Sequence, residues 1–271
     1  MGYEMLVLDL DGTLTNSKKE ITKPTLEAII EIQKRGKKVV LASGRPTKGV
    51  LPLAMQLHLA DYGSYILSFN GARITDCKTK NFIYNKTLPS DVIRPAYELA
   101  SKYAQRGIDL ITYTDDTIYS GFCPNEYTEL EARINQMEII VTEDWPSHIA
   151  FPVNKLLAAG SADVIKELKD ELSTRFRSYL NIYCSEPFFL EIMPQNIDKA
   201  NSLQRLLNSI GLTSNEMICC GDGYNDITMI ESAGLGVAMA NAQPLVLECA
   251  DYVTKSNDEN GVLHVIEEFM Q

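Results

Sequence analysis

Apolar residues in this chain gather in short runs and in helical repeats that alternate with one another. The runs at residues 5–8 and 38–42 are almost wholly apolar, which is typical of strands buried on both faces of a sheet. Between them, apolar residues recur at helical spacing over 24–36, from a proline that suits a helix start to a glycine that ends it. A third run at 65–69 breaks at Asn70-Gly71, which predicts a tight turn into a hairpin. Strands that alternate with helices predict a parallel sheet of the α/β class.

The pattern changes in the middle of the chain, from about Ile83 on. Pairs of predicted strands follow one another there without a helix between them, which indicates an antiparallel sheet with helices on one face, and hence a separate α+β domain. The α/β alternation then resumes. We therefore predict a Rossmann-like parallel-sheet core formed by residues 1–83 and 195–271, with an inserted α+β cap domain at residues 84–194.

The predicted elements of both parts can be placed by residue number. In the insertion we expect helices at 89–106, 124–137 and 161–174, and strands near 108–113, 117–121, 153–159, 178–184 and 188–193. In the resumed core we expect helices at 198–210, 225–233, 244–250 and 259–270, and strands at 217–220, 236–239 and 251–254.

Composition and charge narrow the class of partner. The 271 residues include 25 Lys plus Arg against 36 Asp plus Glu, a net charge of −11, which disfavours a broad surface for binding nucleic acid. No stretch approaches the roughly 20 apolar residues of a membrane span, and the N-terminus leads directly into a strand, unlike a signal peptide. We expect a cytoplasmic protein with no membrane contact and no obligate protein partner.

The six cysteines show no Cys-x-x-Cys pair and no accompanying histidine cluster, so we expect reduced thiols. The adjacent Cys219 and Cys220 lie within a predicted strand, where we expect them to fill the core.

Two acids end the first predicted strand. Asp9 and Asp11 are two residues apart, so in an extended segment their side chains point the same way. Unpaired charge at the end of a buried strand costs several kcal/mol, roughly, unless a cation or a bound ligand offsets it. The alternative interpretation is a strand followed by a solvated Asp-Gly turn.

A second acidic motif, residues 221–226, follows the predicted strand 217–220 directly. Its glycines permit a sharp turn and close backbone approach, while Asp222, Asn225 and Asp226 offer hard oxygen ligands of the kind Mg²⁺ prefers. The alternative is a solvated turn whose polar residues cap the next helix.

Several candidate residues converge on one edge of the predicted sheet. Ligands of open parallel sheets bind beyond the carboxyl ends of the strands, where Asp9, Ser43 and Asp222 would all lie. Lys199 follows Asp198 at the start of a predicted helix, so it would enter the same edge from a helix N-terminus, where anions are favoured.

These residues together resemble the haloacid dehalogenase superfamily. Its four signatures stand in order: Asp9-Leu10-Asp11-Gly12-Thr13-Leu14, then Ser43, then Lys199, then Gly221-Asp222-Gly223-Tyr224-Asn225-Asp226. With an insertion of about a hundred residues between the serine and lysine signatures, the chain is similar to the Cof-type sugar-phosphate phosphatases over essentially its whole length.

The resemblance implies a mechanism with a covalent intermediate. Asp9 would attack phosphorus and become an aspartyl phosphate, while Asp11 would protonate the departing alkoxide and later accept a proton from water. The implied ligands of a Mg²⁺ ion are the Asp9 carboxylate, the backbone carbonyl of Asp11 and the Asp222 carboxylate, with Asp226 in support. The implied phosphate-binding groups are Ser43, Lys199, Asn225 and the backbone amides around Leu10 and Gly44.

Other activities remain to be weighed against hydrolysis. Asp11 favours phosphate-ester hydrolysis or phosphomutase chemistry over dehalogenation, which needs no acid two residues after the nucleophile. A receiver-like phospho-acceptor, which signals without turnover, could use the same acids, hydroxyl and lysine. No cysteine is followed six residues later by arginine, and Val50 stands where a P-loop would need lysine, so a thiol phosphatase and a P-loop protein are excluded.

For the substrate we expect a small phosphorylated metabolite selected by the inserted domain. Hexose phosphates are the first candidate substrates and pentose phosphates the second, and phosphorylated cofactors are a further candidate class.

Overall fold

The computed structural model describes residues 2–270 and divides the chain into two compact units. Unit 1 is formed by the chain up to Tyr84 together with the segment from Asp198 on, and unit 2 by Asn85–Ile197. The predicted boundaries, after residues 83 and 194, thus lie one and three residues before those of the structure. The larger difference arises because the chain stays with unit 2 for three residues beyond its last strand.

Unit 1 is built on an eight-stranded sheet in the order β14-β13-β12-β1-β2-β3-β4-β5. The strands are β1 (Met5–Leu8), β2 (Lys38–Ala42), β3 (Tyr65–Ser68), β4 (Arg73–Asp76), β5 (Phe82–Asn85), β12 (Met217–Gly221), β13 (Leu235–Ala238) and β14 (Tyr252–Val253). All neighbours from β14 to β3 pair in parallel, and β3 and β4 form an antiparallel hairpin. The predicted parallel α/β core is confirmed, as is the hairpin at Asn70-Gly71.

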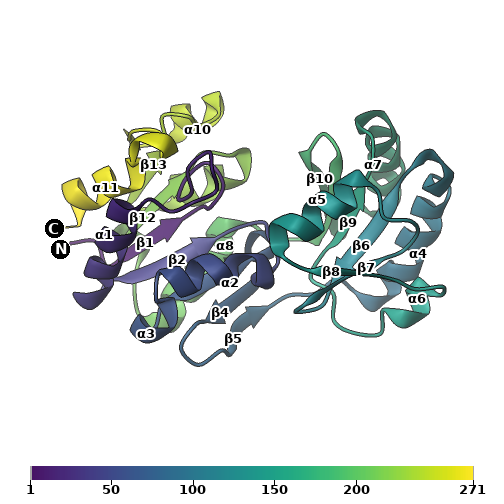
Figure 1. Cartoon of the computed structure of the whole chain (residues 1–271), viewed down its shortest axis with the longest axis horizontal. Coiled ribbons are helices and arrows are strands. Elements are labelled where there is room, and N and C mark those ends of the chain that lie inside the picture. The colour runs from purple at the N-terminus through teal and green to yellow at the C-terminus, as the bar shows by residue number, and fades with distance from the viewer. Residues whose placement is uncertain (1, 271) are drawn as a thin grey trace. The chain divides into compact units, whose positions relative to one another are not determined.

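Helices cover both faces of this sheet (Figure 1). They are α1 (Lys23–Lys34), α2 (Thr47–Gln56), α3 (Leu59–Tyr62), α8 (Lys199–Ile210), α9 (Ile227–Ser232), α10 (Pro244–Cys249) and α11 (Gly261–Phe269). Alternate residues of each strand face opposite sides, so Leu6 and Leu8 pack in one core with α1, α2 and α11, while Met5 and Val7 pack in another with α8, α9 and α10. Burial on both faces explains why the runs of the parallel strands are uninterrupted by polar residues.

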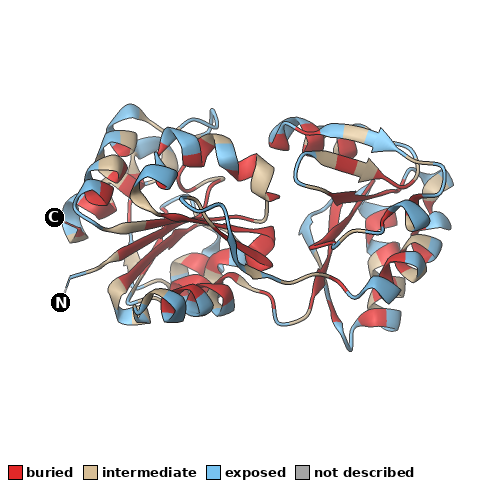
Figure 2. Ribbon diagram, turned by 90° about the horizontal axis from the view of Figure 1, so that it is seen from below, coloured by how far each residue is buried: buried red, intermediate tan, exposed pale blue. Residues whose placement is uncertain are grey.

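Unit 2 is a six-stranded sheet in the order β10-β11-β9-β6-β7-β8. The strands are β6 (Asp109–Tyr113), β7 (Thr117–Ser120), β8 (Glu138–Val141), β9 (Leu156–Ala159), β10 (Leu180–Glu186) and β11 (Phe189–Pro194). The helices are α4 (Ser90–Ser101), α5 (Glu126–Asn135), α6 (Trp145–His148) and α7 (Ala162–Phe176). Leu110, Ala158 and Ile192 face α4 and α7 in one apolar core, and the buried strands and helix faces stand out in red in Figure 2.

The sheet and the helix layers of unit 2 differ from the prediction, and the short helix α6 was not predicted either. Strand β8 was not predicted, and it pairs with β7 in parallel, so the sheet is not wholly antiparallel. The expectation that helices lie on one face is also wrong. Helix α5 contacts side chains of β6 on the sheet face opposite to α4 and α7. Thr128 of α5 donates to Asp109 of β6 at 2.9 Å, and Tyr113 of β6 donates to Glu131 of α5 at 2.8 Å. A helix was needed there because parallel neighbours require a crossover.

Among residues 2–270, no helix is both long and apolar enough to cross a membrane.

Candidate active site

Three loops that carry predicted site residues follow three adjacent parallel strands. Leu8 pairs in register with Leu41 of β2 and with Cys220 of β12, so the loops that begin after these strands leave the same edge of the sheet. Asp9 and Asp222 come from two of these loops. Carboxylate oxygens of Asp9, Asp222 and Asp226 lie within 4.8 Å of one another.

Lys199 lies at the first position of α8, after Asp198 caps the helix by accepting from a backbone N–H at 2.8 Å. Its side chain is fully buried, and its Nζ donates to Asp9 Oδ1 at 2.7 Å and to Asp226 Oδ1 at 2.5 Å. Burial disfavours the ammonium form, but the charges of the two carboxylates outweigh this and raise the pKa of Lys199. The two carboxylates thus favour the ammonium form of Lys199, which lies between them.

The surroundings of Asp9 disfavour the ionised form of its carboxyl group. Burial raises the pKa of its carboxyl well above the usual range, and the charges of Asp226 and Asp222 act in the same direction, against Lys199. Among residues 2–270, Lys199 is the donor to its Oδ1, and no donor reaches its Oδ2. The site thus has one carboxylate oxygen held in place and one left for a ligand.

Asp226 organises the loop that carries Asp222. While Oδ1 binds Lys199, Oδ2 accepts from the N–H groups of Asp222 at 3.0 Å and Gly223 at 2.9 Å. Asp222 itself accepts from Thr13 at 2.8 Å. Burial raises the pKa of Asp222 to about 6, aided by the charge of Asp226 and opposed by the Thr13 hydrogen bond.

These carboxylates fit a hard divalent cation. Oxygen donors of this kind are the ligands that Mg²⁺ prefers, and a cation would offset the repulsion that raises the pKa of Asp9 and of Asp222. Asp226 already uses both oxygens within the protein, which is consistent with its predicted supporting part. A contribution by the backbone carbonyl of Asp11 stays a prediction.

The carboxylate of Asp11 binds two cations that the sequence did not single out as site residues. Arg45 donates to both of its oxygens, from Nε at 2.9 Å and from Nη2 at 2.7 Å, and Lys19 Nζ donates to Oδ1 at 2.8 Å. Partial burial raises the pKa of Asp11, but hydrogen bonds and charge from Arg45 and then Lys19 outweigh it and lower this pKa overall. Arg45 stands two residues after Ser43, in a run typical of the Cof-type subgroup, but the sequence assigned it no role in the site. Lys19 could not be found from the sequence, because a turn brings it back to Asp11.

The predicted phosphate-binding residues line the same loops. Ser43 is buried, and its Oγ accepts from the Arg45 N–H at 3.2 Å. Asn225 is exposed, and its Nδ2 donates to Asn70 Oδ1 at 3.2 Å. Among residues 2–270, no acceptor pairs with the N–H of Leu10, which leaves this donor for a ligand. Gly44 lies against Asn70, since a Cβ added there would be 3.2 Å from Asn70 Nδ2.

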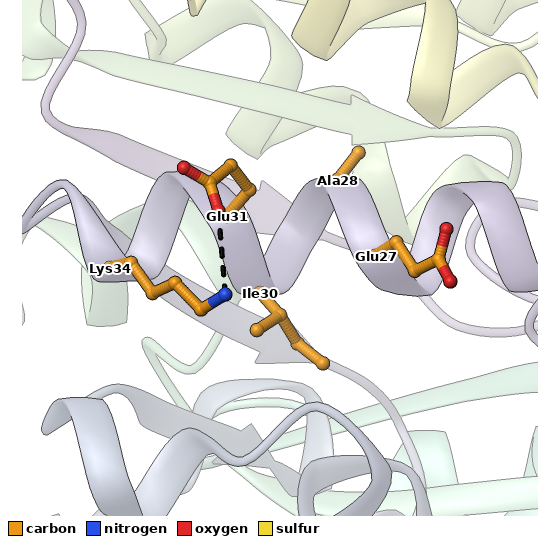
Figure 3. A pocket seen from close by; sticks show the side chains of 5 residues that line it. All are labelled: Glu27, Ala28, Ile30, Glu31 and Lys34. Atoms are coloured by element: carbon orange, nitrogen blue, oxygen red, sulfur yellow. Dashed lines mark ion pairs between the residues drawn. The ribbon is translucent and has the colours of Figure 1, made fainter.

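A hollow in unit 1 lies elsewhere. It measures about 560 Å³ and is lined by five residues of α1: Glu27, Ala28, Ile30, Glu31 and Lys34 (Figure 3). Its charged groups include an exposed Lys34–Glu31 ion pair of 3.5 Å, and it shares no residue with the acidic cluster. We assign it no part in the chemistry.

Comparisons with known proteins show the family of the chain. A family model described as haloacid dehalogenase-like hydrolase matches residues 6–266. The chain is 32% identical over 263 residues to YcsE of Bacillus subtilis (strain 168), a 5-amino-6-(5-phospho-D-ribitylamino)uracil phosphatase, covering 97% of this chain and 94% of that protein.

Two solved structures share the fold. A haloacid dehalogenase-like hydrolase from Bacteroides thetaiotaomicron has 46% identity, 98% coverage of both chains and a TM-score of 0.93. A HAD subclass IIB sugar phosphatase has 24% identity, covers 98% of this chain and 99% of its own, and has a TM-score of 0.81; at this identity it shows the fold alone. The chain therefore belongs to the haloacid dehalogenase-like hydrolase family, as a phosphatase of its Cof type.

Proposed function

We propose that this phosphatase hydrolyses small phosphorylated metabolites, sugar phosphates foremost among them, in a Mg²⁺-dependent reaction through an aspartyl phosphate on Asp9. The observation that carries the proposal is the meeting of Asp9, Asp222 and Asp226 within 4.8 Å at one sheet edge, with Lys199 buried between two of them.

Asp9 is suited to the nucleophile's role by the way it is held. Lys199 fixes Oδ1, so Oδ2 can approach phosphorus in line with the leaving group. A carboxylate needs no prior deprotonation, and its attack forms the acyl phosphate bond while the ester P–O bond breaks. Water then attacks the phosphorus of the intermediate and restores Asp9.

Asp9, Asp222 and the backbone carbonyl of Asp11 would hold the Mg²⁺ ion, with Asp226 in support. When bound, the ion supplies positive charge that reduces the repulsion between Asp9 and a phosphate dianion. Its binding also favours the ionised forms of carboxylates whose pKa burial raises.

Asp11 would protonate the leaving alkoxide and then take the proton of the attacking water. Its pairing with Arg45 and Lys19 favours the ionised form, which is the form that the second step needs. For the first step Asp11 must carry a proton, so its carboxyl has to leave at least one of these cations when substrate binds.

The phosphoryl oxygens would be bound by groups at the same sheet edge. We assign this part to Ser43, Lys199, Asn225 and the N–H groups of Leu10 and Gly44. Unit 2 would act as the cap that selects the substrate. The proposal includes no nucleic-acid, membrane or obligate protein partner, and it places the protein in the cytoplasm.

A phosphorylated ribityl compound is a second candidate substrate. It is favoured by 32% identity to the ribitylaminouracil phosphatase YcsE over 97% of this chain. The alternatives to net hydrolysis are a phosphosugar mutase and a receiver-like phospho-acceptor.

A screen of phosphorylated metabolites for inorganic phosphate release tests the proposal. We expect multiple turnovers on hexose or pentose phosphates with Mg²⁺, and loss of turnover in EDTA that Mg²⁺ restores. Asp9→Asn, nearly isosteric, should fold and be inactive. Sugar-phosphate interconversion without phosphate release would indicate the mutase, and one stoichiometric phosphorylation would indicate the phospho-acceptor. An active Asp9→Asn variant would show that Asp9 is not the nucleophile.

A further inference from the structure

Three consecutive residues after β3 have left-handed backbone conformations. The φ angles are 53° at Phe69, 51° at Asn70 and 102° at Gly71. Glycine adopts this region freely and asparagine tolerates it, but phenylalanine does not, so such a run persists only where its surroundings fix it. Residues 69–71, here named the linking segment, are held in this way from three sides.

The first contact is with the loop after β2. The Phe69 N–H donates to the Arg45 carbonyl at 3.0 Å, and the Asn70 N–H donates to the Ser43 carbonyl at 3.0 Å. These backbone bonds fix the linking segment to the loop that carries Ser43 and Gly44.

The second contact is with the helix that begins at Lys199. Ser202 Oγ of α8 donates to the Gly71 carbonyl at 2.7 Å, and both groups are buried. A Cβ at Gly71 would be 2.6 Å from Ser202 Oγ and 2.7 Å from the Asp198 carbonyl. The first turn of α8 thus packs directly on the segment.

The third contact is with Asn225. The Asn70 side chain is buried, accepts from Asn225 Nδ2 at 3.2 Å and covers the Cα of Gly44. Asn225 is exposed, so this hydrogen bond is what orients its amide.

We propose that Asn70 is a positioning residue for phosphate binding and that the linking segment holds the Ser43–Gly44 loop, the Lys199 helix and Asn225 in one arrangement. This inference rests on the proposed function, since those three places supply the assigned phosphate-binding groups. Asn70 acts through its neighbours: its amide fixes Asn225, and its backbone fixes the loop of Ser43.

Asn70→Gly tests the side chain alone, because glycine keeps the left-handed backbone. Loss of the hydrogen bond to Asn225 should weaken binding of inorganic phosphate in the presence of Mg²⁺ about three- to tenfold by calorimetry. With a phosphate ester that the wild type hydrolyses, KM should rise by a similar factor while kcat changes less. The calorimetric readout needs no turnover, so it separates failure of this inference from failure of the proposed reaction.

Asn260→Gly is the matched control. Asn260 also has a left-handed backbone, with φ 59°, and its side chain also accepts a hydrogen bond, from Thr22 Oγ1 at 2.6 Å, but it precedes α11 and touches none of the site residues. We expect phosphate binding to be unchanged in this variant. Equal binding in wild type and folded Asn70→Gly would overturn the proposal, as would equal weakening in both glycine variants.

A double-mutant cycle shows whether Asn70 acts through Asn225. If it does, Asn70→Gly combined with Asn225→Ala should bind phosphate no more weakly than Asn225→Ala alone. Full additivity would overturn the positioning role.

Ser202→Ala tests the segment from its other side should Asn70→Gly fail to fold. It removes the bond to Gly71 and leaves Asn70 intact, so about threefold weaker phosphate binding is expected, and unchanged binding would contradict a linked segment.

Discussion

Gly12, in the loop that carries Asp9 and Asp11, lies against the carboxylate of Asp222 in the second acidic loop. Its φ is +87°, and an added Cβ would be 2.3 Å from Asp222 Oδ2. Asp222 is also held by Thr13, the next residue, at 2.8 Å. The Asp-Gly turn therefore has a specific purpose here, because it permits the two acidic loops to meet.

Gly12→Ala should displace Asp222 and weaken Mg²⁺ binding. We expect the Mg²⁺ concentration for half-maximal phosphatase activity to rise about 10- to 100-fold, as for loss of a group that orients a metal ligand. Gly36→Ala is the control, since its φ is +91° and nothing lies within 4 Å of its added Cβ. It carries the same backbone cost of about 1–2 kcal/mol without touching a ligand. An unchanged Mg²⁺ requirement in Gly12→Ala would contradict the assignment of Asp222 as a ligand.

The thiolate is the reactive form of cysteine, so a thiol with a raised pKa reacts more slowly than one with an ordinary pKa. Burial and then the charge of Asp76 raise the pKa of Cys77 to about 12, and burial raises the pKa of Cys220 to about 12, whereas Cys123 and Cys184 are exposed. Iodoacetamide at pH 8 should therefore label Cys123 and Cys184 first in the native protein. Peptide mass spectrometry measures the order, and rapid native labelling of Cys77 would contradict the structure.

At the residue scale, the sequence identified the acids and the lysine but not all of their partners. Asp9, Asp222 and Lys199 were readable because each stands next to an element whose apolar pattern is clear. The sequence indicated Asn70 as a turn residue and, with Gly71, as a mark of the Cof-type subgroup, but not its contact with Asn225, which is 155 positions away in sequence.

At the scale of elements, helix α5 depends on a buried carboxylate in unit 2. Asp109 accepts from Ser120 at 2.9 and 2.8 Å, from Thr128 of α5 at 2.9 Å and from the Phe122 N–H at 3.1 Å. Burial raises the pKa of Asp109, and these hydrogen bonds act in the opposite direction. The carboxylate joins β6, β7 and α5 at one point.

Asp109→Ala should destabilise unit 2, because the buried hydroxyls of Ser120 and Thr128 and the half-buried Phe122 N–H lose their acceptor. We expect a loss of about 3 kcal/mol in the free energy of unfolding, measured by denaturant titration. Asp170→Ala, at an exposed position of α7, should change stability by less than about 0.5 kcal/mol. Equal stabilities of the two variants would show that α5 does not depend on the Asp109 carboxylate.

The elements that the sequence missed are short and depend on tertiary partners. Helices α3 and α6 have 4 residues each, and isolated helices of that length are not stable in water. Strand β8 also has 4 residues and lies at an edge of the sheet, where its largely exposed side chains give no pattern of burial. The long elements were predicted because a buried face imposes its period on the sequence.

At the scale of the whole molecule, each unit has its own sheet and its own apolar core. The two ends of unit 2 are joined within the unit, since Lys86 Nζ donates to the Gln195 carbonyl at 2.7 Å. Its first residue is also tied to its interior, where Asn154 Nδ2 donates to Asn85 Oδ1 at 2.7 Å. Closure of this kind lets an insertion fold without support from the chain on either side.

The segment 85–197, expressed alone, should therefore fold cooperatively. Its core, from α4 and α7 against the sheet, contains the fully buried Trp145, whose fluorescence reports on unfolding. We expect one sigmoidal denaturant transition and dispersed amide resonances. Because Asp9, Asp222 and Lys199 all lie in unit 1, this fragment should bind neither inorganic phosphate nor Mg²⁺ at the affinity of the full chain. A broad, non-cooperative transition would show that unit 2 needs unit 1 to fold, and tight phosphate binding by the fragment would place part of the site in the insertion.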